Sequence, residues 1–165
     1  AGFASGQMNA LRRGVPATHL DKSYLEGLNL ALEMALSKLP RAEVKKVHRV
    51  EKFGHEENGD VLSWFKRFEG KNIYTPSFLS TSQMFMDWPH KHLGVYLIPD
   101  DVDGPYDVRK MLKIVDPSRA ESEQEAVFMP GTSFRVLSVK GATITFEVRG
   151  RDFKGTVMDS YFWMK

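Results

Sequence analysis

The sequence predicts one domain of the α+β class, in which helices come first and strands follow. Leucines recur at helical spacing from Leu25 to Leu39, and Pro40 ends the run. Later strand-like segments lack the regular helix between strands that a parallel sheet requires. With 165 residues, 42% of them hydrophobic, the chain is long enough for one core and short for two. We therefore expect a single domain over 1–165, with a helical part at about 1–40 and a β-rich core at about 43–165.

Each expected element follows from a local pattern. Residues 43–50 alternate as a strand does, whereas 61–68 repeat large apolar residues at helical spacing before Gly70. Pro130-Gly131 marks a turn between two strands, and residues 111–115 fit either a strand or a helical turn. The expected helices are residues 8–13, 25–39 and 61–68, and the expected strands are 43–50, 73–82, 95–98, 126–128, 134–139, 143–148 and 156–163.

Composition excludes several classes of function. Charged residues make up 27% of the chain and the net charge is +2, with the basic residues scattered, so neither nucleic acid nor a membrane surface is an expected partner. There is no cysteine for a disulfide, a thiolate metal site or a nucleophile. No apolar run reaches the ~18–20 residues of a membrane span. The chain starts without Met or a visible signal peptide, which suggests a domain excised from a longer protein.

Metal and standard nucleotide motifs are also missing. His90 and His92 stand one residue apart, but no third ligand follows at a recognisable spacing and no HExxH motif occurs, so we expect no metal. The P-loop and GxGxxG patterns are absent, so a nucleotide would not be held by a Walker or Rossmann device.

Two carboxylates, Glu123 and Glu125, stand one residue apart where a strand is expected to begin. Side chains at i and i+2 of a strand point to the same face, and like charges there raise each other's pKa. Such a pair suits a bound cation or a positive charge that develops during a reaction. The alternative is a solvated acidic run from Glu121 to Glu125.

Other segments add candidates of their own. Arg49 lies on the more buried face of its expected strand, so it must be paired or bind an anion, unless it reaches solvent at an edge. Ser80-Thr81-Ser82 ends the next expected strand, where small hydroxyl residues also serve as turn formers. Phe85 and Trp88 belong to an apolar loop over 83–94, which suits either packing onto the core or a ligand platform.

Together, the Arg, S-T-S and E-x-E segments resemble, in type and order, the R-S-E class of mono-ADP-ribosyltransferases, which includes many bacterial toxins. Residues 125–136, with their P-G-T turn, look like the strand that follows the family's catalytic Glu. The resemblance implies two packed, mostly antiparallel or mixed sheets around an NAD cleft. It also implies that NAD is a substrate.

The resemblance also implies roles for single residues. Arg49 would hold the phosphate and nicotinamide-ribose region of NAD, and Ser80 would brace the cleft by hydrogen bonding. Thr81-Ser82 would shape the turn. Glu125 would bind a ribose hydroxyl and stabilise the oxocarbenium, and Glu123 would orient and deprotonate the acceptor.

Further implications concern the acceptor and the partners. The E-x-E pattern is associated with arginine as acceptor, Phe85 and Trp88 lie where the family has its nicotinamide-contacting loop, and 116–122 lies where it has the target-contacting loop. Val50 departs from the Gly that many members have after the Arg, and the target loop lacks an aromatic. The implied partners are a target protein and an inhibitory or immunity protein.

The expected function is therefore a secreted or delivered effector that modifies a protein arginine in the cytoplasm of a target cell. The alternatives are an NAD glycohydrolase, transfer to a nucleic acid or small molecule, and a non-catalytic binding domain.

Overall fold

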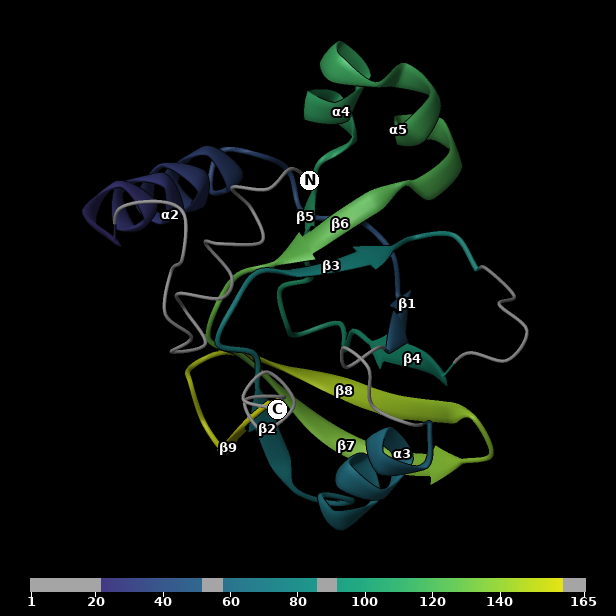
Figure 1. Cartoon of the computed structure of the whole chain (residues 1–165). Coiled ribbons are helices and arrows are strands. Elements are labelled where there is room, and N and C mark those ends of the chain that lie inside the picture. The colour runs from purple at the N-terminus through teal and green to yellow at the C-terminus, as the bar shows by residue number, and fades with distance from the viewer. Residues whose placement is uncertain (1–21, 52–57, 86–91, 159–165) are drawn as a thin grey trace.

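The computed structural model describes residues 22–51, 58–85 and 92–158 (Figure 1). The expected helix at 8–13 and most of the expected strand at 156–163 lie outside these residues. The helices are α2 (Lys22–Leu36), α3 (Asn58–Arg67), α4 (Arg109–Val115) and α5 (Pro117–Glu123). The strands are β1 (Lys46–Glu51), β2 (Asn72–Tyr74), β3 (Leu79–Ser82), β4 (His92–Leu97), β5 (Tyr106–Asp107), β6 (Glu125–Phe128), β7 (Thr132–Lys140), β8 (Thr143–Arg151) and β9 (Thr156–Val157).

The strands of the described residues form one mixed sheet in the order β5-β6-β3-β1-β4-β8-β7-β2-β9. β4 pairs with β8, and β2 with β9, in parallel, whereas the other pairs are antiparallel. Neighbours in this sheet are rarely neighbours in sequence, so the pairing depends on contacts between distant parts of the chain.

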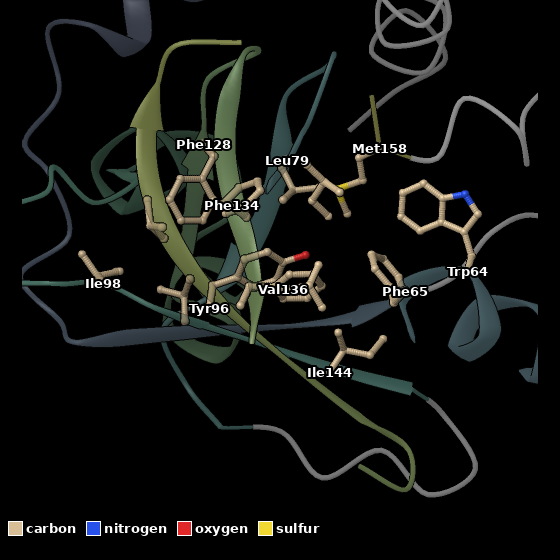
Figure 2. Close-up of a cluster of buried hydrophobic side chains, with 14 of the residues drawn as sticks. Trp64, Phe65, Leu79, Tyr96, Ile98, Phe128, Phe134, Val136, Ile144 and Met158 are labelled. Carbon is tan, nitrogen blue, oxygen red and sulfur yellow. The ribbon is translucent and has the colours of Figure 1, made fainter. Parts of the chain in front are cut away.

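The sheet folds back on itself, so that its two halves face each other across the core. Phe128 of β6 and Phe134 of β7 belong to strands that four others separate in the sheet, yet their ring centroids lie 5.2 Å apart. Tyr96 of β4 lies 5.0 Å from the ring of Phe134 (Figure 2). Tyr96 also stacks on Phe146 at 4.4 Å. The two packed sheets expected from the sequence are thus the two halves of one continuous sheet.

Helix α3 closes one end of this core. Its Phe65 is fully buried, and Trp64 packs against Phe65 at 5.0 Å (Figure 2). Phe65 also meets the ring of Phe146 in a T-shaped contact at 5.2 Å. Gly70 then takes a φ of 77°, a left-handed conformation that favours glycine at a helix end. The prediction of a helix that ends before Gly70 agrees with this.

A second, smaller cluster lies between α2, α4 and the strands β5 and β6. The leucine repeat contributes Leu36 to this cluster, and Leu32 and Leu39 pack against it. The helix ends at Leu36, earlier than the expected Leu39. The buried members of the cluster are Leu36, Phe78, Tyr106, Val108 and Met129.

The segment between β5 and β6 differs from the sequence expectation. Residues 111–115 are helical, as one of the two alternatives held, but Pro117–Glu123 forms the helix α5 where the resemblance implied a target-contacting loop over 116–122. Asp116 is extended, at φ −153° and ψ 82°, because a residue before a proline is driven out of the helical region. Pro117 then begins α5, at the position where a helix tolerates proline best.

Candidate active site

Three neighbouring strands carry the predicted site, with β3 between β1 and β6. The register pairs Ser82 with His48 on one side and with Glu125 on the other. Directly opposed residues share a face of a sheet, and so do residues i and i+2 of one strand. His48, Ser80, Ser82 and Glu125 therefore lie on the same face.

Hydrogen bonds bring Arg49, Ser80 and Glu125 together. The Ser80 hydroxyl donates to Glu125 Oε2 at 2.6 Å, and Arg49 Nη1 donates to the Ser80 carbonyl at 3.2 Å. The guanidinium, the serine and the carboxylate thus form one connected group, although Arg49 and Glu125 lie 76 positions apart in the sequence. Their roles toward a substrate stay predictions.

The register between β1 and β3 is limited to one pair of residues. The two strands pair at His48 and Ser82, and their register extends no further. The guanidinium of Arg49 bonds the Ser80 carbonyl, which lies two residues beyond the paired position. Arg49 has a side chain that is only 21% exposed, so its charge stands at the rim of the core rather than in solvent.

Thr81 and Ser82 bond to the backbone around the site. The Thr81 hydroxyl is buried and donates to the carbonyl of Ala126 at 2.7 Å, which ties β3 to β6. The Ser82 hydroxyl accepts from the backbone N–H of Met84 at 3.2 Å, across the turn that follows β3. Both residues therefore hold the backbone that presents Ser80.

The expectation that Glu123 and Glu125 share one strand is wrong. Glu123 is the last residue of α5, and β6 begins only at Glu125. Between them, Gln124 takes a φ of 44°, and its carbonyl accepts from the backbone of Gln83 at 3.1 Å. The alternation of a strand therefore does not apply to this pair, because the helix that Pro117 begins continues through Glu123. The side chain of Glu123 lies outside the described atoms.

The apolar loop after β3 is described as far as Phe85. That ring is 64% exposed and meets the edge of His48 at 5.4 Å, beside the face that carries Glu125. Burial lowers the pKa of His48, and the charge of Lys46 lowers it further. Trp88 lies outside the described residues. Residues 92–94 belong to β4 rather than to the loop.

Glu51 is a residue of this region that the sequence reasoning missed. Its side chain is fully buried, accepts from Arg49 Nε at 3.3 Å, and accepts from the Tyr96 hydroxyl at 2.5 Å. The available signal was its position two residues after Arg49, on the same buried face of an alternating strand.

The described residues contain neither a cluster of metal ligands nor a membrane-spanning helix. Across residues 22–51, 58–85 and 92–158, no group of three or more His, Cys, Asp or Glu side chains is arranged to hold a metal ion. Within the same ranges, no helix combines the length and the apolar character needed to cross a bilayer.

Sequence comparison finds no match, either to a protein-family model or to a curated protein. Comparison of structures does find neighbours. The SpvB ATR domain from Salmonella superposes with a TM-score of 0.64 at 16% identity, covering 89% of this chain and 95% of that one. C3larvin toxin, an ADP-ribosyltransferase from Paenibacillus larvae, gives 0.58 at 18% identity, covering 86% of each chain.

A third neighbour is the ADP-ribosyltransferase Vis, from Vibrio splendidus, in complex with agmatine. It superposes with a TM-score of 0.57 at 17% identity, covering 89% of this chain and 69% of that one. The identities are low, so the likeness concerns the fold. The α+β prediction is confirmed, and the chain has the fold of the ADP-ribosyltransferase toxins.

Proposed function

We propose that this chain is a mono-ADP-ribosyltransferase, the catalytic domain of a bacterial toxin or effector, which cleaves NAD and transfers ADP-ribose to an arginine of a target protein in the cytoplasm of a target cell. One observation carries the proposal: on an ADP-ribosyltransferase fold, Arg49, Ser80 and Glu125 are joined by hydrogen bonds. The motif order and the hydrogen bonds both point to the same three residues.

The reaction needs a carboxylate at the position proposed for Glu125. Breaking the bond between nicotinamide and ribose gives an oxocarbenium-like transition state, as in glycoside cleavage. A fixed carboxylate beside the ring stabilises that positive charge more than it stabilises the neutral ribose, which lowers the barrier. The bond from Ser80 holds Glu125 Oε2 in place before the charge develops.

The cation and the ring next to Glu125 suit the rest of NAD. A guanidinium is a planar fork of N–H donors that matches phosphate oxygens, so Arg49 is the group proposed for the phosphate region. Phe85 presents an exposed aromatic ring on the same side. We assign that ring to a contact with nicotinamide.

Arginine is the acceptor that we favour. Agmatine, the compound bound in the Vis structure, carries a guanidinium like that of arginine. A protonated guanidinium is a poor nucleophile, so transfer requires a base, and we assign that role to Glu123. The guanidino nitrogen then forms the new bond to ribose, nicotinamide leaves with the electrons of the broken bond, and Glu123 takes the proton.

The decisive experiment incubates the protein with NAD labelled in its ADP-ribose part, first with agmatine and then with a cell lysate. We expect release of nicotinamide, a labelled agmatine adduct, and a labelled protein whose modified residue is identified by mass spectrometry as arginine. Release of nicotinamide with ADP-ribose in solution and no adduct would make the protein an NAD glycohydrolase. Absence of NAD turnover would overturn the proposal.

Glu123→Gln is expected to keep NAD hydrolysis and lose transfer to agmatine, because only transfer needs the acceptor to be deprotonated. The loss of one general base should lower transfer by about 10²–10⁴-fold. Both products are measured in the same reaction mixture. Glu121→Gln is the matched control, since Glu121 lies on the same helix with a side chain that is 75% exposed. A parallel fall of hydrolysis and transfer in Glu123→Gln would contradict this division of roles.

A further inference from the structure

A buried carboxylate stands behind the proposed NAD-binding arginine. We propose that Glu51 is a positioning residue, which holds the guanidinium of Arg49 in the orientation that binds NAD. This inference rests on the proposed function, because it concerns how that site is built. It adds a residue that lies outside the R-S-E motifs.

Burial requires that Glu51 have partners. Its side chain has no exposed surface, and an ionised carboxylate away from water must be paired and hydrogen-bonded. One oxygen accepts from Arg49 Nε and the other from the Tyr96 hydroxyl. Tyr96 is itself held by stacking on Phe146, so the carboxylate rests on a rigid part of the core.

The facing strand leaves space for this carboxylate. Gly94 lies directly opposite Arg49 in the register of β1 and β4, and a Cβ there would overlap Glu51 Oε1 and lie 3.1 Å from Glu51 Cγ and Cδ. The φ of Gly94 is not in the left-handed region, so the backbone does not require glycine at this position. Glycine inside a strand here marks a close approach by a neighbouring group. The strand therefore accommodates the Glu51 side chain.

The contacts of Arg49 hold its guanidinium at two points. Glu51 accepts from Nε, and the Ser80 carbonyl accepts from Nη1. Two bonds to different nitrogens of a planar group define both its position and its plane. The same Ser80 donates to Glu125, so Glu51 begins a connected series that ends at the proposed catalytic carboxylate.

Another ionisable side chain faces Glu51 from β4. His92 lies opposite Glu51 in the register and is 5% exposed. Burial lowers the pKa of His92, and the charge of Glu51 opposes that effect only in part. Near neutral pH the positive partner of Glu51 is therefore Arg49 rather than His92.

The test measures NAD affinity by calorimetry in a double-mutant cycle of Glu51→Gln and Arg49→Ala. Glutamine keeps the shape of Glu51 and removes its charge. We expect Glu51→Gln to weaken NAD binding about tenfold, the effect of losing roughly one charge-assisted hydrogen bond. Arg49→Ala should weaken binding at least as much, and adding Glu51→Gln to it should cause no further loss.

A matched control exists on β8. Glu147 accepts from Arg149 Nη1 at 2.7 Å, so the same two residue types stand two positions apart on a strand, but both are partly exposed. Glu147→Gln should leave NAD affinity unchanged. The thermal unfolding of each variant is also measured, so that NAD affinities are compared only between folded proteins.

Each outcome decides the inference. Wild-type affinity in Glu51→Gln, or an equal loss with and without Arg49, would overturn it and leave Glu51 a purely structural ion-pair partner. Failure of the wild-type protein to bind NAD would instead overturn the proposed function, and this inference with it. If Glu51→Gln does not fold, Tyr96→Phe removes only the hydroxyl that bonds Glu51. That variant should weaken NAD binding by about threefold, and an unchanged affinity would overturn the inference.

Discussion

Glu125→Gln is expected to lower the rate of NAD cleavage by about 10²–10³-fold, the typical cost of removing one group that stabilises transition-state charge. The amide has nearly the shape of the carboxylate, and its oxygen can still accept from the Ser80 hydroxyl, which lies 2.6 Å from Glu125 Oε2. The change therefore removes the negative charge while it preserves the local packing. The rate is measured as nicotinamide released from NAD, with and without agmatine.

Both activities should fall in Glu125→Gln, because bond cleavage precedes transfer to any acceptor. This distinguishes the variant from Glu123→Gln, in which only transfer is expected to fall. Glu121→Gln again serves as the control for loss of a carboxylate from the same region. Nicotinamide release at the wild-type rate in Glu125→Gln would end the proposal that this site is catalytic.

Phe134→Ala is expected to lower the free energy of unfolding by about 3–5 kcal/mol, the range for truncating a fully buried phenylalanine. Phe134 has no exposed surface, and its ring lies 5.0 Å from Tyr96, 5.2 Å from Phe128 and 6.2 Å from Phe146. These neighbours come from both halves of the folded sheet, so the truncation opens a cavity where the halves meet. Urea denaturation followed by circular dichroism measures the change.

Leu137→Ala on the same strand is the control for this prediction. Its side chain is 41% exposed, so the substitution should cost less than about 1 kcal/mol. A loss of similar size in both variants would mean that strand propensity, rather than packing between the halves, determines the stability of β7. A small loss in Phe134→Ala would contradict the arrangement of the core.

Part of the proposed site could be predicted from the sequence because its signals are short-range. Ser80 belongs to the hydroxyl-rich end of an expected strand and Glu125 begins another, and each position follows from neighbours within a few residues. The resemblance to a family supplied their grouping with Arg49. Glu51 was missed because a carboxylate on an alternating strand carries no local sign of what it faces. Its partner Tyr96 and the space at Gly94 come from a strand more than forty positions later.

The sequence by itself determined the local elements: the leucine helix, the helix that ends before Gly70, and the turn at Pro130-Gly131. Helical spacing and residues of restricted backbone freedom act over a few positions and need no distant partner. Only the tertiary structure decided that β1 and β3 pair at the single position His48–Ser82, and that Glu51 contacts both Arg49 and Tyr96. The physical reason is that strand register and burial arise from contacts between distant segments, whose free energy exists only once the sheet has formed and folded onto itself.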